Sequence, residues 1–418
     1  MGEKFVAGNA FKVVGAHTDS PALKVKPISK RDTKGYIQVG IETYGGGLWH
    51  TWLDRDLGIA GRVIIKEKDN QYKHRLVHIN KPLLRVPSLC IHLQSADERA
   101  ALKINAEEHL TAILGLTAEQ LNKTVPGVAE GNLDASKVDA RHAPELLLAL
   151  ARELGVDPST IIDVDLTLAD TQKSQIGGAN NEFLFAPRLD NQMHCFTSTE
   201  ALVAFASSDK LAQDDCVSMI CLFDHEEVGS ESVGGAGSPV MRDAVERISE
   251  VFQAVPGSEI YKIALDKSLL ISADGAHAIH PNYQGKHEVN HQPKMNAGTV
   301  IKTNQNQRYA TSGVTGFIVR ELARKAKVLV QEFVVRQDSP CGSTIGPIIA
   351  ANTGIRTVDV GIPQLSMHSI RETCGIYDLW SNSILLHEFF KSGTIVDQSL
   401  VSADRVEGEI LGSDVTKV

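Results

Sequence analysis

The stretch VSMICLFDHEE, residues 217–227, places a run of mostly apolar side chains directly before Asp224, His225, Glu226 and Glu227. A short apolar run that ends in charged residues is typical of a buried strand that opens into a loop. The same pattern recurs along the chain, at residues 13–16, 268–272, 328–335 and 357–361. We therefore expect several buried strands, each followed by polar residues at its end.

Stretches with helical spacing of apolar residues lie between these strands, at residues 197–207, 241–255 and 315–325. Near-continuous apolar strands that alternate with helices indicate an α/β fold, with a sheet covered by helices on both faces.

The segment that follows the first strand has a different pattern. Residues 36–44, 61–66, 75–79 and 161–168 have the character of short strands, which favours a small antiparallel sheet or barrel. Between them, Leu110, Ile113 and Leu114, and later residues 146–154, recur at helical spacing. The sequence predicts an α/β domain in two parts, residues 1–24 and 179–418, interrupted by an inserted β-rich domain at residues 25–178.

Composition narrows the range of functions. The 418 residues are 42% hydrophobic and 22% charged, values that are ordinary for folded proteins of two or three domains. A net charge of −9 without a block of Lys or Arg disfavours nucleic-acid and membrane partners, and no apolar run has the length of a transmembrane helix. The 6 cysteines form no CxxC pair, which favours free thiols in a reducing compartment, and we expect a cytoplasmic protein.

Ligand-type side chains follow five of the expected strand ends. They are His17 with Asp19, Asp190, Glu226 with Glu227, Asp274, and His368 in the last of these loops. Histidines and carboxylates without cysteine are the ligands of a catalytic zinc-type site, and the carboxylates are numerous enough for two ions. Asp19 is placed to accept the second ring proton of His17.

Each of these residues alone has an ordinary explanation. A single HxD motif is usually not a ligand, an Asp at a strand end often caps a helix, and a Glu pair usually lies on the surface. Two adjacent acids after a buried strand, however, repel each other unless cations compensate them. The interpretation as a metal site depends on the conjunction of all five strand ends.

Other sites were weighed in the same way. Ser232 lies in a sequence similar to a nucleophile elbow, but Ser230 replaces its first glycine. No phosphate-binding glycine motif is present. A cluster of histidines could be a third metal site, a pH-sensitive interface or a packed loop; its members are His277, His280, His287 and His291.

Several motifs together resemble the aspartyl aminopeptidases, a cytosolic metallo-aminopeptidase family related to vacuolar aminopeptidase I. The resemblance runs from about Val14 to Leu386. It is carried by GAHTDSPALKVKP, VGIETYGGGLWHTWLDRDL, RVPSLCIHLQ, GGANNEFLFAPRLDN, DHEEVGSES, ISADGAHAIHPNY, VIKTNQNQRYA, DSPCGSTIGP and PQLSMHSIRE.

The resemblance implies a role for each site residue. Two divalent metal ions per subunit are implied, most simply zinc, although manganese or cobalt also suits these ligands. One ion would be held by His17, Asp190 and Asp274, and the other by Asp190, Glu227 and His368. Glu226 would be the general base and Asp19 would orient His17.

The resemblance also implies substrate and assembly. Lys302 and Tyr309 match the pocket for an acidic side chain, and His92 matches a histidine presented to a neighbouring subunit's active site. The implied activity is removal of N-terminal Asp or Glu from peptides by a tetrahedral homo-oligomer, in which the inserted domain serves dimerisation.

Two alternatives stay open at this point. The same site could serve a neutral-residue aminopeptidase. The chain could also be an inactive assembly subunit, because family members carry a segment before the first strand and Met1 lies close to His17.

Overall fold

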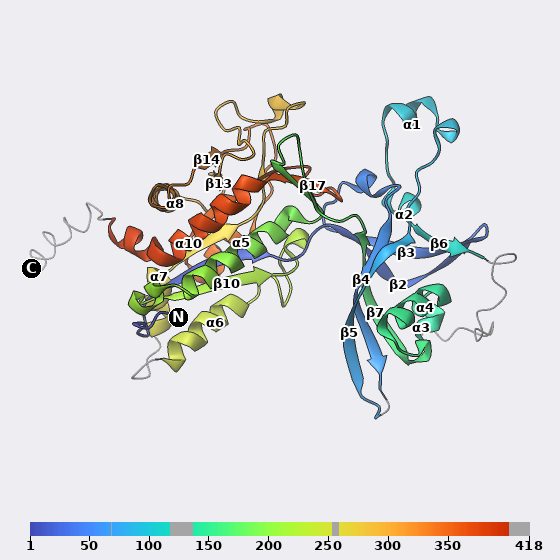
Figure 1. The fold of residues 1–418 in the computed structure, drawn as a ribbon, viewed down its shortest axis with the longest axis horizontal. Helices are drawn as coiled ribbons and strands as arrows, with labels where there is room; N and C mark the ends of the chain where they lie inside the picture. The colour runs from blue at the N-terminus through green and yellow to red at the C-terminus, as the bar shows by residue number, and fades with distance from the viewer. Residues whose placement is uncertain (68, 118–136, 253–258, 401–418) are drawn as a thin grey trace, which may run out of the picture.

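The computed structural model describes residues 1–67, 69–117, 137–252 and 259–400 (Figure 1). A six-stranded central sheet has the order β10-β1-β11-β15-β13-β14. Its strands are β1 (Phe11–His17), β10 (Val217–Phe223), β11 (Leu269–Ala273), β13 (Thr299–Lys302), β14 (Val330–Phe333) and β15 (Arg356–Gly361). The first four strands in the order are mutually parallel, and β13 is antiparallel to β15. The carboxyl ends of β10, β1, β11 and β15 therefore meet at one edge.

Helices cover both faces of this sheet, as the sequence predicted. One apolar cluster joins the sheet to α5 (Leu189–Ala206), α8 (Gly313–Ala326) and α10 (Ile376–Gln398). A second cluster joins it to α6 (Val240–Val251), α7 (Glu259–Lys267) and α9 (Ile345–Thr353). The expected helices at 197–207, 241–255 and 315–325 correspond to α5, α6 and α8, with residues 253–255 outside the described residues.

Local sequence explains where two of these helices begin and end. Ser312 precedes α8, and its hydroxyl accepts the Thr315 N–H while the Thr315 hydroxyl accepts the Ser312 N–H, which satisfies two donors at the helix start. Gly354 ends α9 with a φ of 74°, a conformation that glycine adopts without strain.

A second, smaller sheet lies beside the strand ends of the central sheet. Its order is β12-β16-β17-β9-β8. The strands are β8 (Gln175–Gly177), β9 (Phe183–Ala186), β12 (Ala276–His277), β16 (Pro363–Leu365) and β17 (Glu372–Gly375). Because β9 leads to Asp190 and β16 leads to His368, this sheet brings two further candidate ligands to the same edge.

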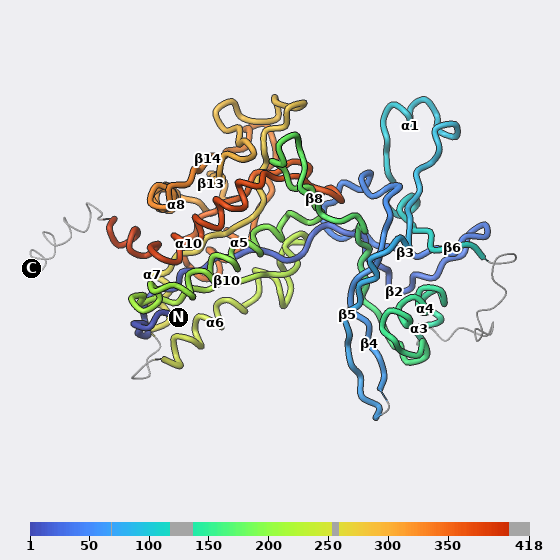
Figure 2. The backbone as a smooth tube through the Cα atoms, in the orientation of Figure 1, coloured from blue at the N-terminus to red at the C-terminus, as the bar shows by residue number. Residues whose placement is uncertain are grey.

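A third sheet is antiparallel throughout, with the order β5-β4-β7-β2-β3-β6. Its strands are β2 (Ala22–Thr33), β3 (Tyr36–Tyr44), β4 (Leu57–Lys66), β5 (Tyr72–Leu84), β6 (Ala112–Leu116) and β7 (Ile161–Asp170). It has its own apolar core, against which α4 (Pro144–Leu154) packs. Figure 2 shows it to one side of the central sheet and its helices.

The remaining helices are short. They are α1 (Ala96–Ala100), α2 (Ala106–His109), α3 (Val138–Arg141), η1 (Trp49–Trp52), η2 (Ile91–Leu93), η3 (Pro158–Thr160), η4 (Asp209–Gln213), η5 (Glu226–Val228) and η6 (Gln284–Lys286). Among the described helices, none combines the length and the apolar character that crossing a membrane requires.

One predicted element is wrong. Leu110, Ile113 and Leu114 have helical spacing, but α2 ends at His109 and residues 112–116 form β6, which pairs with β3. Pairing with β3 decides the structure of these residues, although their apolar side chains have helical spacing. Leu110 and Ala112 are still part of the apolar core. The domain boundaries at 24/25 and 178/179 stay a prediction; β8, on the inserted side of the second boundary, pairs with β9.

Candidate metal centre

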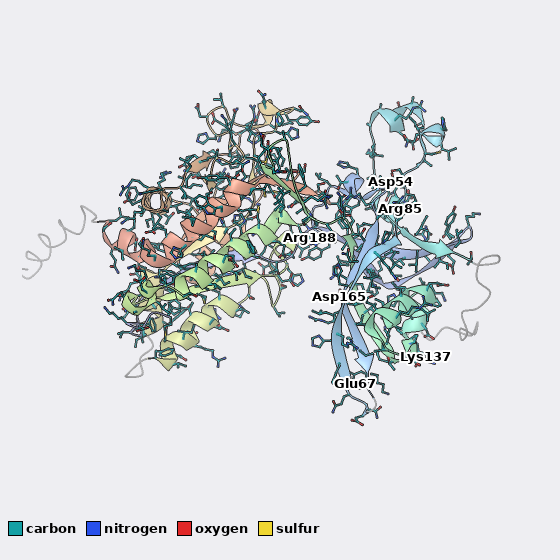
Figure 3. All side chains as sticks on the ribbon, in the orientation of Figure 1. Asp54, Glu67, Arg85, Lys137, Asp165 and Arg188 are labelled. Carbon is teal, nitrogen blue, oxygen red and sulfur yellow. The ribbon has the colours of Figure 1, made fainter. Side chains whose placement is uncertain are left out.

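The candidate ligands lie where the parallel strands end. His17 is the last residue of β1, Asp274 directly follows β11, and Glu226 and Glu227 open η5 after β10. Asp190 lies at the start of α5, two residues after Arg188, which Figure 3 labels between the central sheet with its helices and the third sheet. The loops after several strands therefore converge, as expected for the edge of an α/β sheet.

A first group consists of His17, Asp190 and Asp274, all of them buried. The Nε2 atom of His17 lies 3.4 Å from Asp190 Oδ1 and 3.7 Å from Asp274 Oδ1. Three ligand atoms are thus gathered around one point.

A second group consists of Asp190, Glu227 and His368. The Nε2 atom of His368 lies 3.5 Å from Asp190 Oδ2 and 3.3 Å from Glu227 Oε2. Asp190 belongs to both groups, and its two oxygens face the two different histidines. Asp190 could therefore contribute one oxygen to each of two cations.

The hydrogen-bond partners in the described residues test whether these side chains suit metal ions. His17 Nε2, Asp190 Oδ1 and Glu227 Oε1 are buried and have no hydrogen-bond partner there. A buried polar atom without a partner is costly, whereas a coordinated cation would satisfy all three. Nitrogen and oxygen donors also suit zinc, manganese and cobalt. The residues present fit two divalent ions.

The electrostatics of the two groups point the same way. Burial alone would lower the pKa of His368, but Asp190 and Glu227 raise it to about 11. Burial is likewise outweighed at His17, whose pKa its carboxylate neighbours raise well above the usual value. Burial alone would raise the pKa of Asp190, but the two histidines hold it well below the usual value. The carboxylates therefore attract positive charge strongly.

Asp19 connects the site histidine to the loop that carries the two glutamates. Its Oδ1 atom lies 3.4 Å from His17 Nδ1 and accepts the Glu226 N–H at 3.0 Å. Its Oδ2 atom accepts the Glu227 N–H at 3.1 Å and the Tyr44 hydroxyl at 2.7 Å. Burial alone would raise the pKa of Asp19, but His17, Tyr44 and the Glu227 N–H lower it to about 2, so Asp19 holds the site as a carboxylate.

Glu226 is more exposed than the adjacent Glu227, whose side chain is 4% exposed. Its side chain is 16% exposed, and Oε2 lies 3.9 Å from His17 Nε2. Burial, followed by the negative charges of Asp274, Glu227 and Asp190, raises its pKa to about 8. A carboxyl group with this pKa can take up and release a proton near neutral pH.

Two of the three predicted substrate residues lie beside the centre. Lys302 ends β13, its Nζ donates to the Gly275 carbonyl at 3.0 Å, and it lies 4.0 Å from Asp274 Oδ2. The ring of Tyr309 lies 5.0 Å from the same ammonium. His92 is exposed in η2 and, among the described residues, makes no hydrogen bond or ion pair with the other candidate residues.

Three residues near the centre were not singled out from the sequence, although each lies in a quoted motif. Tyr44 bonds Asp19, the Gly46 carbonyl accepts the His368 Nδ1–H at 2.8 Å, and Glu372 bonds two backbone N–H groups of candidate ligands. Tyr44 and Gly46 come from the end of β3 and the loop after it. A cleft of about 620 Å³ lies beside Tyr44. It is lined by residues of the third sheet, such as Arg62, and by residues of the candidate centre, such as Asp19 and His368.

The competing sites do not assemble. Ser232 Oγ and Asp224 Oδ2 both approach His225 Nδ1, at 2.9 Å and 3.7 Å. A catalytic triad needs its acid and its nucleophile on opposite ring nitrogens. Within the described ranges, no metal-type group includes a member of the histidine cluster. A further group, Asp214, Asp215 and Cys216, lies beside the buried ammonium of Lys12, which already supplies a positive charge.

Comparison with known proteins gives the family. The model of the family described as aminopeptidase I zinc metalloprotease (M18) matches residues 1–390. A probable aspartyl aminopeptidase of Ricinus communis is 49% identical over 416 residues, covering 96% of this chain and 84% of that protein. An aspartyl aminopeptidase of Dictyostelium discoideum is 45% identical over 414 residues, covering 95% and 85%.

A solved structure agrees with these relatives. The structure described as the S. cerevesiae mApe1 dodecamer has a TM-score of 0.81 and 34% identity, covering 96% of this chain and 84% of that one. The resemblance read from the motifs is confirmed, and so is the α/β fold class. The chain is a metallo-aminopeptidase that belongs to the aminopeptidase I zinc metalloprotease (M18) family.

Proposed function

We propose that the protein removes N-terminal Asp or Glu from peptides with two divalent ions that share Asp190. The observation that carries this proposal is the position of Asp190, whose two oxygens face His17 at 3.4 Å and His368 at 3.5 Å. The names of the relatives, aspartyl aminopeptidases, support the same activity.

The bound ions would supply Lewis-acid chemistry, polarising the peptide carbonyl and lowering the pKa of the attacking water. Glu226 takes the proton of that water and returns it to the leaving amine. Its partial exposure and its position, with Oε2 3.9 Å from His17 Nε2, suit a group that both accepts and donates a proton at the centre. Asp19 holds His17 and the backbone of both glutamates in place for this step.

Lys302 is the proposed determinant of acidic specificity. Only one hydrogen bond of its ammonium is made within the described protein, so further donors are available to a substrate carboxylate. Tyr309 lies against the ammonium and limits its movement.

A second candidate, a neutral-residue aminopeptidase with the same centre, is favoured by one observation. The Lys302 side chain is only 3% exposed and already lies 4.0 Å from Asp274, which partly compensates its charge. Substitution distinguishes the two. Lys302→Met keeps the buried volume, and we expect a much larger loss of activity on Asp and Glu substrates than on Leu substrates. Equal losses would support the neutral-residue function.

Assembly and location belong to the same proposal. We expect a homo-oligomer, because the related mApe1 structure is described as a dodecamer, and we expect the inserted domain to dimerise. In a tetrahedral assembly the exposed His92 would reach a neighbouring active site. All six cysteines are free in the structure, which supports a reducing compartment such as the cytoplasm.

Glu226→Gln tests the general base. The variant keeps size and every candidate ligand, so we expect full metal content and a kcat lower by roughly 10²–10⁴, the range for loss of acid–base catalysis. Glu231→Gln, an exposed change in the same loop, is the control and should leave kcat unchanged. A Glu226→Gln enzyme with more than a tenth of the wild-type kcat would exclude this role.

A further inference from the structure

Glu372 links the backbones of two candidate ligands that lie far apart in the sequence. It is the first residue of β17 and is 2% exposed. Its Oε2 atom accepts the Asp190 N–H at 2.8 Å, and its Oε1 atom accepts the His368 N–H at 2.7 Å. The two oxygens therefore serve one residue each.

The sheet order explains this position. In the second sheet, β17 lies between β9 and β16, and the loops after β9 and β16 carry Asp190 and His368. Glu372 begins the strand between these two loops, so its side chain can reach both. Within the described residues, the one similar link at the centre is Asp19, whose carboxylate accepts the backbone N–H groups of the proposed base Glu226 and the candidate ligand Glu227.

Stability alone does not account for a carboxylate here. Among the described residues, Glu372 forms no ion pair, and the neighbouring Arg371 contacts Asp170 instead. A buried carboxylate without a cationic partner is costly, and an apolar residue would pack at the start of a strand at lower cost. The backbone of His368 also needs support, because its φ of 65° is unfavourable for a residue with a side chain.

We propose that Glu372 is a positioning residue of the metal centre, which fixes the backbones of Asp190 and His368 so that their side chains face each other before an ion binds. The 3.5 Å separation of His368 Nε2 and Asp190 Oδ2 is the geometry that it sets. Glu372 belongs to neither ligand group of the described residues, so its role would be indirect. The inference rests on the proposed two-ion centre and adds to it a determinant of metal affinity.

The chemistry of the side chain makes the inference specific. A glutamine at this position has one acceptor oxygen, and its NH2 group would face the second backbone N–H. An aspartate keeps the charge but is one methylene shorter, so it cannot reach both amides. Both variants therefore release one of the two ligand backbones.

Asp378 provides a matched control. It is fully buried at the start of α10, where its Oδ2 atom accepts the Asn296 N–H at 2.5 Å and its Oδ1 atom accepts the Gly298 N–H at 2.8 Å. It is thus a second buried carboxylate that joins two backbone amides, but neither amide belongs to a candidate ligand. Asp378→Asn removes a similar bond without touching the metal centre.

The test measures zinc binding to metal-free protein by competition with a chromophoric chelator, and the visible absorption of bound Co²⁺. Metal affinity falls 10–100-fold when a group that orients a ligand is lost, so we expect a loss of roughly this size for the second ion in Glu372→Gln. Asp378→Asn should bind both ions as the wild type does, although both variants melt at a lower temperature. Glu372→Asp carries the same test if the glutamine variant does not fold.

Two results would overturn the inference. One is wild-type zinc affinity in the Glu372 variants, and the other is an equal loss of affinity in Asp378→Asn, which would indicate general loosening. The proposed function fails in a different way, because it would be contradicted by a wild-type chain that binds fewer than two ions.

Discussion

Asp19→Asn changes one oxygen of the site to an NH2 group and leaves the size of the side chain unchanged. The Asp19 carboxylate accepts the backbone N–H of Glu226 on Oδ1 and that of Glu227 on Oδ2, while His17 Nδ1 lies beside Oδ1 and Tyr44 bonds Oδ2. Whichever way the amide is turned, its NH2 group faces a backbone N–H. One of the two glutamates therefore loses its acceptor.

The expected loss of zinc affinity follows from the one backbone N–H that is left without an acceptor. A buried donor left without a partner costs about 1–3 kcal/mol. If only the metal-bound form of the protein bears this cost, zinc affinity falls by about 5- to 150-fold. Loss of a group that orients a metal ligand, as the Asp19 carboxylate orients Glu227, gives a similar range, about 10–100-fold in metal affinity. We therefore expect Asp19→Asn to lower zinc affinity or kcat by about one to two orders of magnitude.

The assay compares zinc affinity, measured by chelator competition, with kcat on a peptide that begins with Asp. Asp224→Asn is the control, since Asp224 lies two residues before Glu226 but is half exposed and, within the described residues, its side chain accepts only the His225 N–H. We expect the control to stay within twofold of the wild type, about the scatter of surface substitutions. An Asp19→Asn protein with wild-type zinc affinity and wild-type kcat would refute the reasoning.

Three further predictions concern the same centre. Metal binding should release about one proton per ion near neutral pH, because the pKa of His368 is raised to about 11 and only the neutral imidazole binds metal. The apparent metal affinity should therefore fall as the pH falls. Calorimetry in two buffers that shows no proton release would contradict this prediction. Tyr44→Phe removes the hydroxyl that donates to the Asp19 carboxylate. It should lower the free energy of unfolding by about 1.5–3 kcal/mol, the usual value for a hydrogen bond to a charged group. An unchanged midpoint of denaturant unfolding would show that the bond contributes nothing. Gly45→Ala introduces a Cβ 3.1 Å from the Glu227 Cβ, at a position whose φ is 71°. We expect the free energy of unfolding to fall by about 1–2 kcal/mol and zinc to bind more weakly. A variant with wild-type zinc affinity would show that the loop adjusts without moving Glu227.

Much of the fold could be predicted because parallel strands obey a simple rule. Their carboxyl ends meet at one edge, so His17, Asp274 and the Glu226–Glu227 pair could be expected to lie together once the strands were identified. Asp190 and His368 reach the same edge from the second sheet, whose strands are too short to leave a clear pattern. The strand-end pattern still placed both residues among the candidate ligands, but their pairing with each other was expected only from the family resemblance.

The supporting residues could not be found in this way. Tyr44 and Glu372 act through bonds to Asp19 and to backbone N–H groups, and Glu372 is 182 positions from Asp190 in the chain. A backbone donor has no sequence signal, so only the folded chain reveals these bonds. The same limit explains β6, where pairing with β3 decided the structure of residues that have helical spacing.

The most direct test of the account is the number of zinc ions that the metal-free wild-type chain binds, measured while the hydrolysis of a peptide with N-terminal Asp is followed. A centre in which Asp190 faces both His17 and His368 predicts two ions per chain and full activity only when both are bound. Full activity with one ion per chain would contradict the shared role of Asp190.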